Sequence, residues 1–195
     1  ENCICALVGD QLSDRKPLVD RPSNSASIHS DLGLQRLHHR IEIRDAASSL
    51  KGSAFGSAFL TFATPDRPRD DLLYLWMHEL NHAWLPGKML RQYGRRGPDL
   101  YWFSEGFTEF VTHWLLEDSG IKPAGHLLRE LTKAQQRLAV IAAPERYAIL
   151  LQRFHRDAAA NRQIYDRGFL LAARWDQQIT CQSGGTRSLR DALRS

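Results

Sequence analysis

The feature that most constrains this chain is residues 78–82, which have the form H-E-x-x-H. Residues four apart lie on one face of a helix, so His78 and His82 can direct two imidazoles at one point. Zinc accepts imidazole nitrogen and carboxylate oxygen, and catalytic zinc sites use three protein ligands and a water. Glu105 can supply the third ligand, and Glu79 can take a proton from the water. The pattern therefore predicts a hydrolytic zinc site.

The sequence around the motif predicts a buried helix over about residues 71–85, because apolar residues dominate it. Two aspartates at 70–71 place acidic side chains in the first turn, where a helix start favours them. The Pro-Gly pair at 86–87 is expected to end this helix directly after the second histidine. Ser104 is expected to be the N-cap of a second helix, which carries Glu105 near its start and runs to about residue 118.

Four segments resemble the gluzincin metallopeptidases and, more narrowly, the glycyl aminopeptidase family. Residues 78–84 have the family's H-E-x-x-H-x-W pattern, and residues 100–108 are similar to its L-W-x-x-E-G-x-T pattern. Residues 165–171 are similar to its Y-x-K-G segment, and residues 188–193 resemble its closing S-L-D-D helix. The likeness runs from about residue 72 to the C-terminus.

The resemblance implies a role for each matching position. It implies that His78, His82 and Glu105 bind one zinc ion per chain, and that Glu79 is the general base and acid. It also implies that Tyr165 donates a hydrogen bond to the developing oxyanion. A phenol can make this hydrogen bond because it stays protonated below its pKa of about 10. Without the resemblance, Tyr165 could equally be a half-buried core tyrosine.

Helical spacing adds one further residue to the predicted zinc site. Glu109 follows Glu105 by one helical turn and lies on the same face. A zinc-bound histidine usually gives its other N–H to a carboxylate or a carbonyl. Glu109 is therefore predicted to accept this hydrogen bond, and a surface carboxylate is the alternative.

The stretch before the zinc helix departs from the family. Glycyl aminopeptidases and their relatives carry a Gly-rich segment there with a Glu that binds the substrate α-amine, whereas residues 51–59 keep the glycines and contain no Glu. Burying an ammonium group without an anionic partner is costly, so this segment does not predict strict aminopeptidase specificity. Gly52, Ser53 and Gly56 are predicted to bind a substrate backbone by strand addition; a plain edge strand is the alternative.

The remaining sequence predicts an α+β fold in one domain. A chain of 195 residues with 43% hydrophobic residues can bury a core of its own. We expect a thermolysin-like gluzincin catalytic domain over 1–195, with a sheet-rich part over 1–70 and a helical part over 71–195. The family's N-terminal β-domain and C-terminal peptide-binding module are expected to be absent. The finer expectations are strands over 3–8, 37–43 and 54–63, a loop over 10–33, and further helices over about 124–141, 144–157, 161–180 and 188–194.

Composition limits the partners. No apolar run is long enough to span a bilayer. The net charge of +4 comes from scattered arginines without a compact basic motif, so nucleic-acid binding is not predicted. Three cysteines are too few for a disulfide framework and fit a bacterial cytoplasm or periplasm equally. A signal peptide is expected to be absent or already removed, and the oligomeric state stays open.

The function predicted first is zinc-dependent hydrolysis of peptide bonds, with a peptide as the substrate, and the resemblance implies an aminopeptidase type of zinc metallopeptidase. Hydrolysis of another amide or of an ester at the same site is an alternative. A second alternative is a zinc-containing peptide-binding module without turnover. The intact Glu79 argues against that module, because a purely structural zinc does not require a general base.

Overall fold

The structure is a computed structural model that describes residues 51–55, 58–62, 66–92 and 97–194. These residues form a hairpin followed by helices. In chain order the elements are β1 (Lys51–Phe55), β2 (Ala58–Phe62), α2 (Arg69–Gln92), the short 3₁₀ helix η1 (Pro98–Leu100), α3 (Tyr101–Asp118), α4 (His126–Ala139), α5 (Tyr147–Arg153), α6 (Ala158–Gln182) and α7 (Leu189–Arg194).

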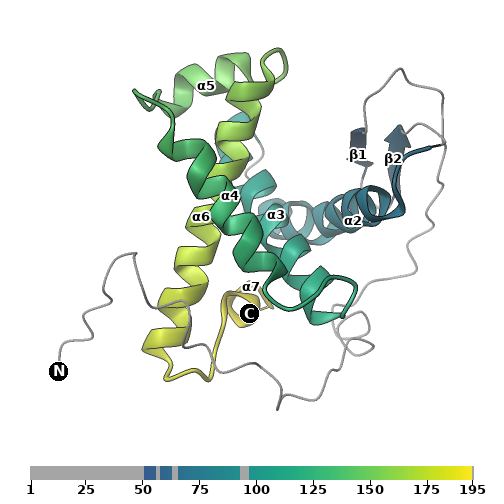
Figure 1. Cartoon of the computed structure of the whole chain (residues 1–195), viewed down its shortest axis with the longest axis vertical. Helices are drawn as coiled ribbons and strands as arrows, with labels where there is room; N and C mark the ends of the chain where they lie inside the picture. Colours follow the sequence, from purple (N-terminus) through teal and green to yellow (C-terminus); the bar gives the residue numbers. More distant parts are fainter. Residues whose placement is uncertain (1–50, 56–57, 63–65, 93–96, 195) are drawn as a thin grey trace.

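Helices α3 and α6 form the centre of the described structure (Figure 1). Helix α2 packs on α3, and the hairpin β1–β2 packs on α2. Helices α4, α5 and α7 pack on α6. The arrangement brings α6 next to α3 although α4 and α5 separate the two along the chain, and the predicted catalytic and metal-binding residues lie on α2, α3 and α6.

Two clusters of buried apolar side chains hold the helices together. The larger one joins α2, α3 and α6, and its largest buried members are Leu85, Phe107, Phe110 and Phe169. The smaller one joins α5 to the start of α6. Because aromatic side chains bury a large apolar area, the α3–α6 contact contributes most to the core.

The start and end of α6 follow from local sequence. The Asp157 side chain accepts hydrogen bonds from the backbone N–H groups of Ala159 at 2.8 Å and Ala160 at 3.2 Å. This capping satisfies two donors that have no partner within the helix. After the last turn, Gly184 takes a left-handed conformation with φ of +61°, which glycine adopts at little cost.

Two glycines let α3 and α6 approach backbone to backbone. A Cβ atom on Gly168 would lie 1.9 Å from the carbonyl oxygen of Trp102, and one on Gly106 would lie 2.3 Å from the Cα of Gly168. No side chain fits at either position without moving a helix. The close approach brings Tyr165 of α6 next to Glu105 of α3.

The predicted α+β class, a thermolysin-like domain with an N-terminal sheet, is wrong. Within the described ranges, strands occur only in the antiparallel hairpin, where Lys51 pairs with Phe62 and Phe55 with Ala58. The segment 54–63 was predicted to be one strand, but its described residues are divided between the end of β1 and the whole of β2. The hairpin packs against α2, whereas the other helices bury their apolar faces against each other, because two five-residue strands cannot cover them.

The expected strands at 3–8 and 37–43 and the expected loop at 10–33 lie outside the described residues. The helices predicted at 124–141, 161–180 and 188–194 are confirmed to within a few residues as α4, α6 and α7. The helix predicted at 144–157 exists as the shorter α5, which begins only at Tyr147.

Two predicted helix ends are wrong. Helix α2 does not stop at the Pro-Gly pair at 86–87 but continues to Gln92. A proline removes only one backbone donor from the helix. The helix continues because the residues after the pair are all good helix formers. Helix α3 begins at Tyr101, with Leu100 at the N-cap, so Ser104 lies inside it and caps nothing. The apolar residues before Ser104 belong to the helical face that packs on the core.

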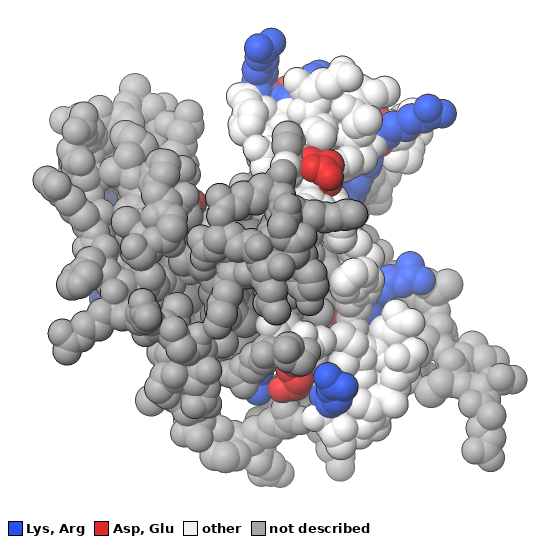
Figure 2. Space-filling view, turned by 180° about the vertical axis from the view of Figure 1, so that it is seen from behind, with Lys and Arg blue, Asp and Glu red and all other residues white. Residues whose placement is uncertain are grey.

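The surface of the described part has mixed charge. On the face in Figure 2, lysine and arginine side chains are spread out, with acidic side chains between them. None of the described helices combines the length and the hydropathy that a membrane span needs.

Candidate metal centre

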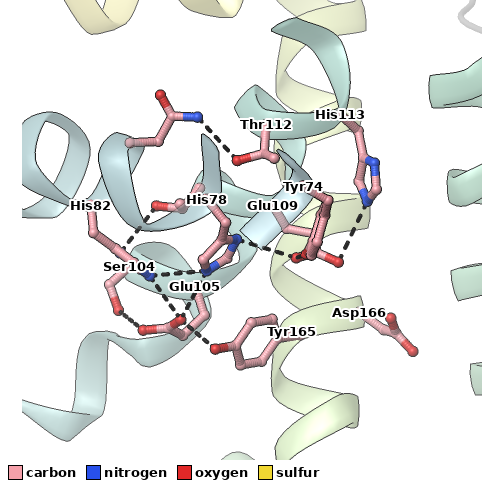
Figure 3. A network of polar contacts seen from close by, with 12 residues as sticks. Tyr74, His78, His82, Ser104, Glu105, Glu109, Thr112, His113, Tyr165 and Asp166 are labelled. Atoms are coloured by element: carbon pink, nitrogen blue, oxygen red, sulfur yellow. Dashed lines mark hydrogen bonds and ion pairs between the residues drawn. The ribbon is translucent and has the colours of Figure 1, made fainter. Parts of the chain in front are cut away.

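Three side chains of types that can bind a metal ion come from two helices and meet at one point. His78 and His82 lie one turn apart on α2, and Glu105 lies on the facing helix α3 (Figure 3). The Nε2 atoms of the two histidines are 3.0 Å apart. The Oε2 atom of Glu105 is 3.6 Å from Nε2 of His78 and 3.2 Å from Nε2 of His82. His78 is buried, and the other two side chains are half-buried.

This spacing fits a tetrahedral metal ion. With zinc-to-ligand bonds of about 2.0–2.1 Å and tetrahedral angles, ligand atoms lie roughly 3.3 Å from each other. The three observed distances lie between 3.0 and 3.6 Å. Two imidazole nitrogens and one carboxylate oxygen are also a ligand set that zinc accepts. Among the described residues, these three side chains have ligand atoms that lie close enough to one another to share one ion.

Glu105 is ready to act as an anionic ligand. Burial would by itself raise the pKa of its carboxyl group, but hydrogen bonds from His78 and His82 outweigh burial and hold the pKa well below its usual range. Its second oxygen, Oε1, accepts a hydrogen bond from the Ser104 hydroxyl at 3.2 Å. The negative charge is therefore fixed at the position where a cation would need it.

Glu79 lies next to the first histidine and is only 6% exposed. Burial raises the pKa of its carboxyl group to about 7, and the nearby charge of His82 opposes the increase only in part. A carboxyl group with a pKa near neutrality can both accept and return a proton at physiological pH, which is what a general base and acid must do.

Tyr165 reaches the same point from α6. Its hydroxyl donates a hydrogen bond to Oε2 of Glu105 at 2.5 Å, and its ring lies nearly parallel to the His78 ring, with centroids 6.0 Å apart. Burial, followed by the negative charge of Glu105, raises the pKa of the phenol well above its usual value. The hydroxyl therefore keeps its proton and remains a hydrogen-bond donor.

Each histidine has a polar neighbour beside its other ring nitrogen, although Nδ1 of His78 itself makes no hydrogen bond. Nδ1 of His78 is 3.5 Å from Oε2 of Glu109, and Nδ1 of His82 is 3.5 Å from the Thr108 hydroxyl. Burial would raise the pKa of Glu109, but His113 and the Arg162 charge hold it well below the usual range. The Glu109 carboxylate therefore lies beside His78 without the hydrogen bond that was predicted, and its role at a zinc ion stays a prediction.

Three residues around the site were missed by the sequence analysis. Tyr74 donates a hydrogen bond to Glu109, Thr108 faces His82, and Arg162 donates to Glu109 at 3.1 Å. Each lies three or four residues from a predicted site residue on its own helix, so helical spacing could have placed them on the correct faces. Spacing alone does not tell which neighbouring side chain each one reaches.

The predicted substrate-binding residues are described only in part. Gly52 and Ser53 lie in β1, opposite Thr61 and Leu60 of β2, and β1 packs against α2. Gly56 lies outside the described residues. Binding of a substrate backbone along this hairpin stays a prediction.

No protein-family model and no curated protein matches this sequence. The fold is similar to that of an aminopeptidase N family protein from Idiomarina loihiensis, known from its crystal structure, with a TM-score of 0.59 and 18% sequence identity. The similarity covers 88% of this chain and 36% of that protein, so the chain spans about a third of its length. At this identity the comparison establishes a shared fold. The narrower resemblance to glycyl aminopeptidases rests on the sequence motifs and stays a prediction.

Proposed function

We propose that this chain is a zinc-dependent peptidase in which His78, His82 and Glu105 hold one zinc ion. The observation that carries the proposal is the spacing of the three donor atoms, 3.0–3.6 Å, which matches the edge of a tetrahedral zinc site. A buried carboxyl group, Glu79, lies directly beside the first ligand. The similar fold of an aminopeptidase N family protein supports a peptidase over other hydrolases.

The metal ion and the side chains would supply different parts of the chemistry. Zinc, when bound, polarises a carbonyl group and lowers the pKa of water to roughly 7. Glu79 takes the proton from the attacking water and later gives it to the leaving amine, which its pKa of about 7 permits. Because Glu79 is buried, little bulk water competes for this proton.

Tyr165 would stabilise the negative charge that develops on the carbonyl oxygen. Its hydroxyl is protonated and already lies at the ligand cluster, where it donates to Glu105. A phenol has one proton to donate, so Tyr165 would exchange Glu105 for the carbonyl oxygen as negative charge develops there. The free α-amine of a substrate has no such fixed partner in residues 51–59, which contain no acidic side chain. Strict aminopeptidase specificity is therefore not part of the proposal.

The test is the variant Glu79→Gln in zinc-loaded protein. We expect the zinc content to stay at one ion per chain and kcat on peptide substrates to fall by about 10²–10⁴-fold, because the amide cannot accept the proton. Glu130→Gln is the matched control, since Glu130 pairs with Lys133 on the surface of α4. A Glu79→Gln protein that keeps the wild-type rate contradicts the mechanism. Wild-type protein that binds zinc but turns over no peptide, amide or ester supports the binding-module alternative instead.

A further inference from the structure

The Glu109 carboxylate is held on both of its oxygens. Oε2, which lies 3.5 Å from Nδ1 of His78, also accepts a hydrogen bond from the Tyr74 hydroxyl. Oε1 accepts a hydrogen bond from Nη2 of Arg162 at 3.1 Å and lies 3.6 Å from Nε2 of His113. The carboxylate is only 4% exposed, so these side chains and not water fix its direction.

Arg162 has a second contact that fixes its own position. While Nη2 donates to Glu109, Nε donates to Oδ1 of Asp166 at 2.9 Å. Asp166 is 1% exposed and also accepts two hydrogen bonds from Arg137, at 2.7 and 2.8 Å. The guanidinium carbon of Arg162 lies 5.1 Å from the centre of the Tyr165 ring. Arg162 is thus clamped between two buried carboxylates beside the metal centre.

We propose that Arg162 is a positioning residue that holds the Glu109 carboxylate toward His78 and thereby strengthens metal binding. This inference rests on the proposed function, because it assumes that His78 is a zinc ligand. By occupying Oε1, Arg162 leaves Oε2 as the oxygen that faces the imidazole. Carboxylates behind ligating histidines set the orientation and basicity of the ring, so a carboxylate that can rotate is a weaker support.

The shape of the guanidinium explains why arginine is suited to this position. Its planar fork donates from two nitrogens at a fixed angle, which lets one side chain hold two carboxylates from different helices. The charges alternate from Arg137 through Asp166 and Arg162 to Glu109, so each buried carboxylate has a cationic neighbour. A purely structural ion pair would need only the contact to Asp166. The second contact links this pair to the metal centre.

The first test compares the zinc affinity of Arg162→Gln and Arg137→Gln, measured by competition with a chromophoric chelator. Both variants remove a cation from Asp166, but only the first removes the contact to Glu109. We expect Arg162→Gln to bind zinc about tenfold more weakly, at the lower end of the range for such supporting contacts, and Arg137→Gln to bind it like the wild type. Equal losses in both variants would mean that the network acts through general stability, which overturns the inference.

The second test asks whether Arg162 acts through Glu109. In a double-mutant cycle with Glu109→Gln, the effect of Arg162→Gln on zinc affinity should disappear, since the carboxylate that it holds is gone. Additive effects overturn the inference. If Arg162→Gln does not fold, Arg162→Lys replaces it: the ammonium keeps the charge but cannot reproduce the fork, so a smaller loss in the same direction is expected. An unchanged zinc affinity in Arg162→Lys also overturns the inference. Wild-type protein that binds no zinc overturns the proposed function together with this inference.

Discussion

At the scale of single residues, three side chains of the candidate centre contact the same oxygen atom. Oε2 of Glu105 lies within 3.6 Å of both histidine nitrogens and accepts the hydrogen bond of the Tyr165 phenol. The ligand set and the proposed oxyanion donor therefore meet at the same atom. A substrate carbonyl group bound at that point would lie near the phenol, and a tyrosine used only for packing would not need the contact to Glu105.

Tyr165→Phe tests this arrangement because it removes only the hydroxyl. We expect kcat to fall by about 10²–10³-fold, as is usual when one oxyanion donor is lost, while KM and zinc content change little. Steady-state kinetics of the zinc-loaded protein measure both constants. Tyr101→Phe is the matched control, since its hydroxyl contacts His155 at 3.5 Å at the surface. A normal kcat in Tyr165→Phe would leave Tyr165 as a packing residue.

The sequence predicted which candidate ligands come together but not which side chains surround them. His78, His82, Glu79 and Glu105 were predicted because a short motif specifies them by spacing, and the geometry does bring the three donors together. The partners of Glu109 were not predicted. Tyr74 is 35 positions and Arg162 is 53 positions away from it, on other helices. Such contacts depend on how helices pack, and no local pattern encodes them.

At the scale of helices, the distance between α3 and α6 decides whether Tyr165 reaches the candidate metal centre. Glu105 and Tyr165 lie on different helices, and they meet because Gly106 and Gly168 let the two backbones touch. The sequence analysis recognised both glycines only as parts of motifs. The ends of helices were predicted less well than their existence. Helix α2 continues past the Pro-Gly pair at 86–87, because the good helix formers after the pair favour helix more than the pair disfavours it.

Gly168→Ala tests the close approach. Alanine in a helix normally gains about 1 kcal/mol over glycine, but here the new methyl group meets the carbonyl oxygen of Trp102, which belongs to the backbone and cannot rotate away. We expect a net loss of about 2–3 kcal/mol in the free energy of unfolding, measured with urea. The control is Gly184→Ala, where φ is positive and nothing lies within 4 Å, so the cost is about 1 kcal/mol. A Gly168→Ala protein as stable as the wild type contradicts the contact.

At the scale of the whole molecule, a bound metal ion would join helices that are otherwise held by side-chain packing. His78 and His82 come from α2, and Glu105 comes from α3. The ion would therefore connect the part of the chain that carries the hairpin to the α3–α6 centre. Folding and metal binding should be coupled, because the three ligands are brought together only in the folded state.

This coupling predicts that zinc raises the melting temperature. An ion that binds only the folded state at 1,000 times its Kd adds about 4 kcal/mol, which for a chain of this size corresponds to roughly 8–16 °C. Differential scanning calorimetry with zinc and with a chelator measures the shift. Glu105→Ala should lose most of it. An equal shift in that variant would mean that zinc binds elsewhere, and His113 and His126, whose ring nitrogens are 3.0 Å apart, would be the next ligands to replace.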